Sequence, residues 1–227
     1  MRNELDIMME ILVETLLLTL FAILCIQFDQ IWTENKELHL KKIFPCGVKG
    51  SVLYLLILIS LGAVAWMLRF FYQKTWLFTL QRLCLISVLW PAAVSDHKAY
   101  RIPNRLLVIG LIFWAVLTAL TAFFLPESLG LMLRSELIAT AAITLICLLL
   151  MVAVKGGLGM GDMKLMMLMA LFLGIEAVCY SMFYSILVAF IEAVFLLVTK
   201  RKGRKDHMAF APCLLIGTLL CSILSGV

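Results

Sequence analysis

Long apolar runs separated by short polar segments make up most of this chain. A helix needs about 20 mostly apolar residues to cross about 30 Å of hydrocarbon, and most of the runs reach that length. The run 163–173 is too short, and we expect a partial helix that continues past Gly174 into the next run. The pattern predicts an all-α protein, a polytopic transmembrane helix bundle of seven to eight helical segments. The apolar runs lie at about 8–28, 51–72, 76–95, 105–125, 136–154, 163–173, 175–199 and 208–226.

Composition also places the chain in a membrane. Hydrophobic residues make up 64% of its 227 residues and charged residues 15%, whereas soluble domains contain about 45–50% apolar and about 25% charged residues. We expect the first run to be retained as a helix, because it is long enough to span and lacks a small-residue cleavage site. No repeat or long linker divides the chain, and 29–50 is the only polar segment of any size. The sequence therefore predicts a single membrane-embedded domain, 1–227, in a lipid bilayer.

Lysine and arginine are distributed unevenly between the two sides of the predicted bundle. With eight segments, the loops 29–50, 96–105, 155–164 and 200–207 fall on one side and hold fourteen of the 19 basic residues. Cytoplasmic loops carry an excess of Lys and Arg, so we expect this side to face the cytoplasm. The net charge of +5 therefore reflects membrane orientation, and no nucleic-acid partner is expected. Four basic residues lie on the other side, namely Arg2, Arg69, Lys74 and Arg134.

Two aspartates at the cytoplasmic ends of apolar runs are the candidate catalytic residues. Asp96 ends the third run, and Asp162 follows a stretch with four glycines among residues 156–161 and opens the next helical pattern. Two carboxylates held close together cannot easily both ionise, so they share a proton and can hydrolyse an amide with water alone. No metal or cofactor is needed. A helix start favours an ionised acid, which makes Asp162 the better candidate for the ionised member. Spacing alone does not bring the two helices together.

The residues around each aspartate predict shaped, non-helical surroundings. Pro103 restricts Ile102 to an extended conformation, and Gly159 and Gly161 let another group approach closely. Lys164 follows Asp162 by two positions and also contributes to membrane orientation.

These residues form spaced motifs. Asp96 is followed by five residues and then Ile102-Pro103-Asn104, and Asp162 lies within Gly159-Met160-Gly161-Asp162-Met163-Lys164. Near the C-terminus stands Ala211-Pro212-Cys213-Leu214-Leu215-Ile216-Gly217. Together the motifs resemble those of the type IV prepilin peptidases, which are membrane aspartic proteases of the GxGD class. In the C-terminal motif, Cys213 stands where that family has an aromatic residue. The resemblance covers the chain from about residue 85 to its end.

The resemblance implies a substrate and a set of roles. It implies a peptidase domain that cuts a prepilin or pilin-like pseudopilin at the cytoplasmic face of the inner or plasma membrane, between a short basic leader and a long hydrophobic helix. The oligomeric state and the filament system served are left open. The implied catalytic residues are Asp96 and Asp162, and the implied site-shaping residues are Ile102, Pro103, Asn104, Gly159, Gly161 and Lys164.

The first cytoplasmic loop departs from the longer members of that family. Those members are bifunctional and carry two CxxC pairs there, which bind zinc in a region associated with N-methylation of the cleaved product. In this chain the loop 29–50 is short and keeps only Pro45-Cys46-Gly47. One thiol cannot make a four-ligand zinc site. We therefore expect peptidase activity without methyltransferase activity.

Two other readings use the same acids. One is a presenilin-like protease that acts on other membrane proteins, although Ile102-Pro103-Asn104 favours the prepilin type. The other is a transporter or channel whose paired acids bind protons or cations near a broken helix. Inside the apolar runs, Arg82 and Glu192 are expected either to pair with each other or to face water.

Overall fold

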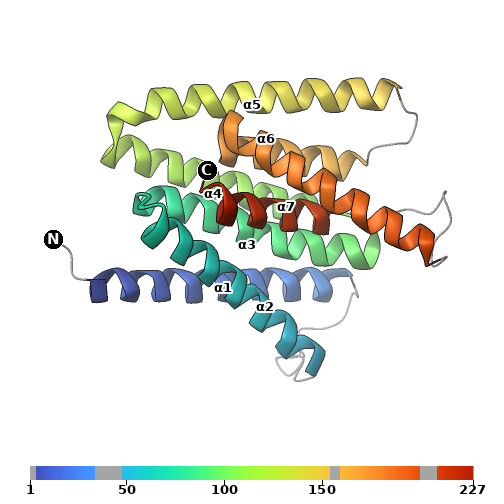
Figure 1. The fold of residues 1–227 in the computed structure, drawn as a ribbon, viewed down its shortest axis with the longest axis horizontal. Helices are drawn as coiled ribbons and strands as arrows, with labels where there is room; N and C mark the ends of the chain where they lie inside the picture. Colours follow the sequence, from blue (N-terminus) through green and yellow to red (C-terminus); the bar gives the residue numbers. More distant parts are fainter. Residues whose placement is uncertain (1–3, 34–47, 154–158, 200–208, 227) are drawn as a thin grey trace.

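The computed structural model describes residues 4–33, 48–153, 159–199 and 209–226. These residues form seven α-helices and a short π-helical segment, and they contain no strand (Figure 1). The prediction of an all-α bundle is confirmed. The elements are α1 (Glu4–Thr33), α2 (Val48–Trp66), the π-helical η2 (Met67–Phe71), α3 (Trp76–Ala99), α4 (Asn104–Phe124), α5 (Pro126–Ala153), α6 (Met160–Val198) and α7 (Ala211–Leu224).

Six of these helices are long and apolar enough to cross a membrane. The exception is α7, which has 14 residues and at about 1.5 Å per residue is too short to span about 30 Å of hydrocarbon. The run 208–226 therefore contains a shorter helix than its apolar length suggested. Conversely, α5 begins at Pro126, ten residues before the predicted run 136–154, because Pro suits the first position of a helix and Glu127 favours the first turn.

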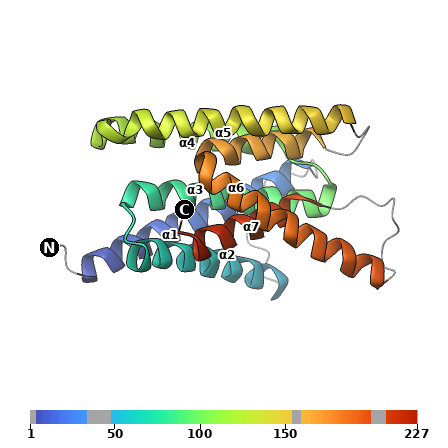
Figure 2. The same ribbon diagram turned by 45° about the horizontal axis from the view of Figure 1, so that its top comes forward.

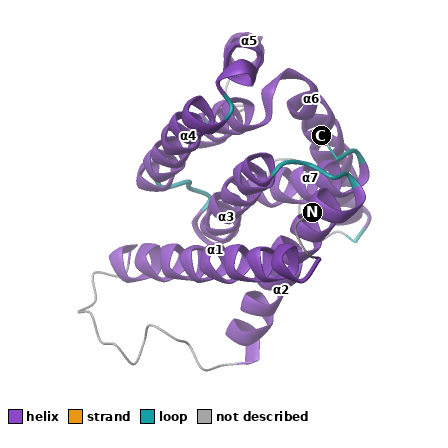
Figure 3. Cartoon of the chain, turned by 90° about the vertical axis from the view of Figure 1, so that its left-hand side faces the viewer, coloured by secondary structure: helices purple, strands orange, loops and turns teal. Residues whose placement is uncertain are grey.

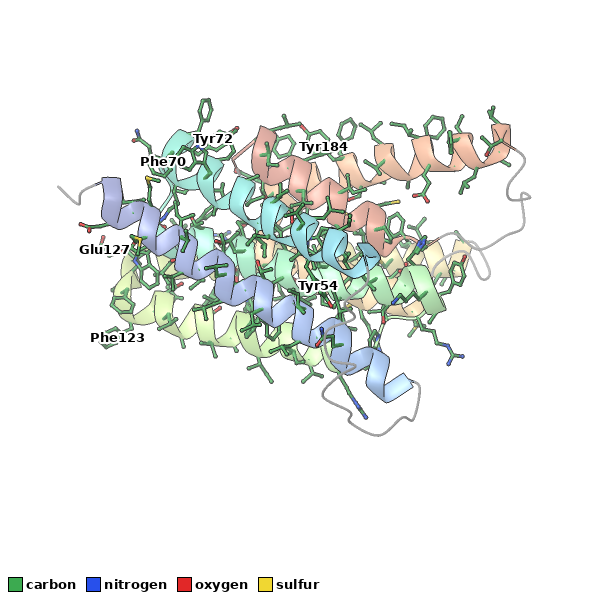
Figure 4. The ribbon with its side chains drawn as sticks, turned by 90° about the horizontal axis from the view of Figure 1, so that it is seen from below. Tyr54, Phe70, Tyr72, Phe123, Glu127 and Tyr184 are labelled. Atoms are coloured by element: carbon green, nitrogen blue, oxygen red, sulfur yellow. The ribbon has the colours of Figure 1, made fainter. Side chains whose placement is uncertain are left out.

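The helices run back and forth between two ends of the bundle. The ends of α1, α3 and α5 and the starts of α2, α4, α6 and α7 gather at one end, called here the aspartate end (Figure 1). The helix ends that flank the four basic loops therefore lie together, as the alternation predicted. At the opposite end, Figure 4 shows Phe70, Tyr72, Phe123 and Glu127 gathered, and aromatic side chains of this kind are typical of a membrane–water interface.

A break divides α6 into two halves, called here α6a (160–173) and α6b (175–198). At Gly174 the backbone has φ 70° and ψ −179°, a conformation essentially restricted to glycine. The half α6a runs away from the aspartate end beside α5, and α6b then returns toward that end (Figures 1 and 2). We expected the partial helix to continue past Gly174 into the next run, but the chain reverses its direction at Gly174. The half α6a therefore enters the bundle without crossing it.

The centre of the bundle is α3, which is buried along most of its length and lies between α1, α4 and α7 (Figure 3). Close packing with α4 and α6a depends on one glycine. A side chain at Gly110 would lie 2.6 Å from Leu168 of α6a and 3.4 Å from Val88 of α3. The absence of a side chain there lets the three helices that carry the predicted motifs approach one another.

Polar contacts hold the opposite end together. Arg69 of η2 donates to Glu10 of α1 over 2.8 Å, which neutralises both charges. The Tyr72 hydroxyl lies 3.0 Å from the carbonyl oxygen of Ile223 and 2.8 Å from that of Leu224, the last residues of α7. These carbonyls have no partner within their own helix, so Tyr72 serves as a C-terminal cap.

Candidate active site

Asp96 lies in the last turn of α3 and is buried, with 6% of its surface exposed. The helix ends at Tyr100, which takes a left-handed conformation and donates its N–H to the carbonyl oxygen of Asp96 over 2.9 Å. The side-chain Oδ2 of Asp96 accepts a hydrogen bond of 3.0 Å from the N–H of Ala211, the first residue of α7. The N-terminal end of α7 thus points an unpaired N–H and the positive end of its dipole at this carboxylate.

Asp162 lies in the first turn of α6a and is partly buried. Gly159 is the N-cap residue of this helix, and its carbonyl oxygen accepts from the N–H of Met163 over 3.1 Å. A Cβ atom on Gly159 would lie only 3.0 Å from Oδ2 of Asp162. The absence of a side chain at Gly159 therefore leaves room for the Asp162 carboxylate. The group that approaches this glycine is thus the predicted catalytic side chain.

Two contacts join the motif after Asp96 to the motif around Asp162. A Cβ atom on Gly161 would lie 3.3 Å from Cβ of Ile102, so the start of α6a rests on the loop between α3 and α4. Beside it, the Lys164 ammonium donates to the side-chain oxygen of Asn104 over 3.1 Å. Pro103, with φ −68° and ψ 128°, is the extended N-cap residue before α4. It stands between Ile102 and Asn104, the two residues that make these contacts.

These contacts bring the two aspartates together at one end of the bundle. Asp96 is near enough for its negative charge to act on the Asp162 carboxylate across the gap between α3 and α6a. One acid is buried and held by a backbone N–H, while the other is partly open beside a glycine. Two carboxyl groups placed in this way can act as an acid and a base on one substrate.

Comparison with known proteins finds similarity in the part of the chain that carries both aspartates. The sequence model of the type IV leader peptidase family matches residues 83–194, a region that contains both aspartates. Over this region, just under half of its length, the chain is similar to the type IV leader peptidase family.

Two relatives of this peptidase family extend the match. The chain is 28% identical over 138 residues, 60% of its length, to a prepilin leader peptidase/N-methyltransferase of Bacillus subtilis (strain 168). It is 28% identical over 180 residues, 77% of its length, to a protein of the same name from Neisseria gonorrhoeae. The matches span 52% and 59% of the two relatives. No solved structure matches the chain significantly.

Sequence reasoning missed one contributor to the site and did not find the partners of Arg82 and Glu192, two charged residues outside the predicted site. The N–H of Ala211 was not foreseen, although the motif that it opens was noted. Glu192 does not pair with Arg82 in the described structure; its Oε2 accepts from the Cys213 thiol over 3.2 Å. Arg82 instead donates to the carbonyl oxygens of Phe172 and Leu173, over 3.2 and 3.4 Å. The two residues therefore do not pair, and Arg82 is buried, whereas the Glu192 side chain is exposed.

A cavity of about 350 Å³ opens between α4, α5 and α6a beside the Asn104–Lys164 contact. Its walls are mostly apolar and include Leu107, Met167 and Leu171. The cavity is therefore large enough to receive apolar side chains.

Metal ligands do not cluster in the described part of the chain. Within residues 4–33, 48–153, 159–199 and 209–226, no group of three or more His, Cys, Asp or Glu side chains is placed to hold a metal ion. Cys46 and the rest of the Pro45-Cys46-Gly47 motif lie outside the described residues.

Proposed function

We propose that this chain is an aspartic endopeptidase that removes the leader peptide of type IV prepilins or pilin-like proteins at the cytoplasmic membrane face. The observation that carries the proposal is the meeting of Asp96 and Asp162. Two residues separated by two membrane passes lie at one end of the bundle, close enough for their charges to interact. Similarity to the peptidase family supports the same reaction class.

We assign the ionised role to Asp96 and the protonated role to Asp162. The N–H of Ala211 donates to Asp96 at the start of α7, and a hydrogen bond and a helix dipole of this kind both favour the ionised carboxylate. The shared proton then belongs on Asp162. This reverses the assignment expected from the helix start of α6 alone, because α7 supplies Asp96 with a helix start as well.

Hydrolysis would then proceed by two proton transfers. As a water oxygen attacks the scissile carbonyl carbon, Asp96 takes a proton from that water and Asp162 gives its proton to the carbonyl oxygen. When the tetrahedral intermediate breaks down, Asp96 gives its proton to the leaving amine and Asp162 recovers one from the hydroxyl. Both carboxyl groups end in their starting states, and no other cofactor is consumed.

The surroundings of the pair suit a membrane-bound substrate. The helix ends at the aspartate end flank the sequence segments that carry most of the basic residues, which supports a cytoplasmic position. The apolar cavity beside Lys164 and Asn104 would accept apolar side chains next to the scissile bond. The substrate class comes from the family, whose named relatives are prepilin leader peptidases.

The proposal does not extend to the N-methyltransferase activity in the relatives' names. Cys46 is the single cysteine in the segment 29–50, and one thiol is too few for a structural zinc site. A methylation assay with S-adenosylmethionine and a cleaved pilin tests this part separately. Transfer of a methyl group by the purified chain would refute it.

The transport alternative is weakened by what fills the break in α6. In transporters with broken helices, carbonyls at a half-helix end bind the coupling cation. Here the Arg82 guanidinium lies against the carbonyls of Phe172 and Leu173, where such a cation would bind. This favours a structural role for the break in α6 over cation binding, and a catalytic role for the two aspartates.

The test is a cleavage assay with purified protein in detergent, where no ion gradient exists, using a prepilin and a panel of other membrane proteins. We expect cleavage at the leader boundary, unaffected by chelator, and a loss of about 10²–10⁴-fold in Asp96→Asn and Asp162→Asn. Asp6→Asn, an exposed acid at the opposite end, is the matched control and should retain the wild-type rate.

Each alternative predicts a different outcome of this assay. Cleavage of other membrane proteins with prepilins left intact would support the presenilin-like reading. If folded wild-type protein cleaves neither substrate class, the peptidase proposal is refuted.

A further inference from the structure

The half-helix α6a ends inside the bundle, where its last carbonyl groups have no water to bond. An α-helix leaves its final four carbonyls without partners in its own backbone, and in an apolar environment each such group is costly. Phe172 and Leu173 are the last residues before the reversal at Gly174. Both are buried, with 1% and 6% of their surface exposed. This end of α6a therefore needs donors from another helix.

Arg82 of α3 supplies those donors. Its two terminal nitrogens bond the carbonyl oxygens of Phe172 and Leu173, one nitrogen to each. The planar guanidinium can address two carbonyls at once, and its positive charge matches the negative end of the α6a dipole. Arginine is expensive to bury in a membrane protein, and here only 3% of it is exposed. A simple space-filling role would not need this residue type.

The surroundings of Arg82 compensate for its burial. The ring of Phe78 lies 4.6 Å from the guanidinium carbon. The Glu136 carboxylate of α5 is near enough to act on Arg82 electrostatically. Glu136 is itself held by Gln81 over 2.8 Å and by Trp114 over 2.9 Å. Three helices thus hold one charged network at the depth where α6a ends.

The other side of the break has its own partner. The N–H of Ile175, at the start of α6b, donates to Oγ of Ser135 over 3.0 Å. Arg82 therefore holds the end of α6a, while Ser135 holds the start of α6b. The break is satisfied on both sides by neighbouring helices, which fixes where in the bundle the chain reverses.

Arg82 shares its helix with Asp96, and the residues it holds share theirs with Asp162. Arg82 and Asp96 are fourteen residues apart, which is close to four turns and places both on nearly the same side of α3. We propose that Arg82 is a positioning residue: by holding the inner end of α6a against α3, it fixes how far α6a slides and so sets Asp162 opposite Asp96. This inference rests on the proposed peptidase function for its catalytic consequence, but the placement of α6a can be measured independently.

The catalytic test compares two variants of Arg82 with a matched arginine. Arg82→Gln removes the charge and should lower kcat by about 10–100-fold, since a displacement of about 1 Å can cost about 10²-fold in rate. KM should change by less than about twofold, because Arg82 does not line the apolar cavity proposed to receive substrate side chains. Arg82→Lys restores the charge but bonds as a point donor, so its kcat should lie between wild type and Arg82→Gln. Arg69→Gln loses a partly buried arginine paired with Glu10 at the opposite end and should keep kcat.

The structural test measures the placement of α6a without using activity. Spin labels on His97→Cys and Met160→Cys, both exposed residues beside the two aspartates, report the distance between α3 and α6a. Cys46 and the exposed Cys179 are replaced by Ser in this background. Arg82→Gln should broaden the distance distribution, Arg82→Lys should narrow it again in part, and Arg69→Gln should leave it as in wild type.

The outcomes separate the two proposals. If wild type cleaves no prepilin but Arg82→Gln still broadens the distance, the peptidase function fails and the placement of α6a by Arg82 stands. If Arg82→Gln lowers kcat with an unchanged distance, or leaves both unchanged, the positioning role is refuted. Should Arg82→Gln fail to fold, an Arg82→Lys variant with wild-type kcat and distance would support a need for the charge alone and overturn the two-carbonyl geometry.

Discussion

The two halves of α6 differ in almost every physical respect. The half α6a is enclosed, with its larger side chains in the core, and it carries Asp162. The half α6b exposes most of its large apolar side chains, including Tyr180, Phe183 and Phe190, as expected of a helix that faces lipid. The difference teaches that in this bundle the half that carries the chemistry is kept away from lipid, while the half that faces lipid anchors α7.

The halves are also held by different means. Side chains from other elements hold α6a at both of its ends, through Ile102 and Asn104 at its start and through Arg82 at its finish. Small residues hold α6b against α7. Ser181 and Thr218 share a hydrogen bond of 3.0 Å, and Gly217 packs directly on the backbone of Ser185. Changes in α6a should therefore affect activity, and changes in α6b should affect stability.

The largest expected effect is on activity and comes from the start of α6a. In Gly161→Val the new side chain would press on Ile102, since even a Cβ atom would lie 3.3 Å from that residue's Cβ. Asp162 would move away from Asp96, and kcat/KM for prepilin cleavage should fall by about 10–100-fold. Gly130→Val is the control, because Gly130 has no atom within 4 Å of a new Cβ. Equal activity in the two variants would contradict the role given to the contact.

The break itself should respond to Gly174→Ala. A residue other than glycine at φ 70° and ψ −179° is strained, and the new Cβ atom would lie 2.8 Å from Oγ of Ser135. We expect the free energy of unfolding in detergent to fall by about 1–3 kcal/mol.

The control for the break is Gly62→Ala in α2, where a new Cβ atom meets nothing within 4 Å. Gly62 lies within a regular helix, so alanine there should leave stability unchanged or raise it by up to about 1 kcal/mol. The argument from backbone conformation fails if Gly174→Ala is as stable as Gly62→Ala.

The smallest expected effect lies in α6b. A double-mutant cycle with Ser181→Ala and Thr218→Val isolates the hydrogen bond between the two hydroxyls. Its coupling energy should be about 0.6 kcal/mol, the average for such bonds in membrane bundles. Cleavage per folded molecule should stay within about twofold of wild type, because neither residue contacts the aspartates. A coupling energy of zero would show that the hydrogen bond does not stabilise the protein. A large loss of cleavage would show that α6b also affects activity.

Periodic apolar content predicted the helices well and their ends less well. The apolar runs identified every helix, because a span must be apolar along its length whatever its neighbours are. The start of α5 was missed by ten residues, since Pro126-Glu127-Ser128 is a helix start whose polarity hides it from a search for apolar runs. Gly174 was noted, but its dihedral angles depend on Ser135 and Arg82, which lie far away in the sequence.

Some features of the candidate site could likewise be predicted from the sequence, and others could not. The motifs around Asp96 and Asp162 could be read from the chain, because glycine, proline and aspartate in that spacing have few other uses at the ends of apolar runs. The donor to Asp96 is a backbone N–H of Ala211, and a backbone group carries no signal in the residue type. Arg82 was visible as a charge inside an apolar run, but only a pair with Glu192 or contact with water was expected for it, because backbone carbonyl groups carry no signal in the residue type.

The sequence by itself determined that this chain is a helical membrane protein with two aspartates at one end, because hydrophobic length and alternation of sides are local properties. Only the tertiary structure decided that α6a stops inside the bundle, that Arg82 takes its carbonyl groups, and that α7 supplies the donor to Asp96. The physical reason is that these features satisfy backbone groups left unpaired at helix ends. In an apolar environment such groups must find partners, and which partners they find depends on how the helices are packed.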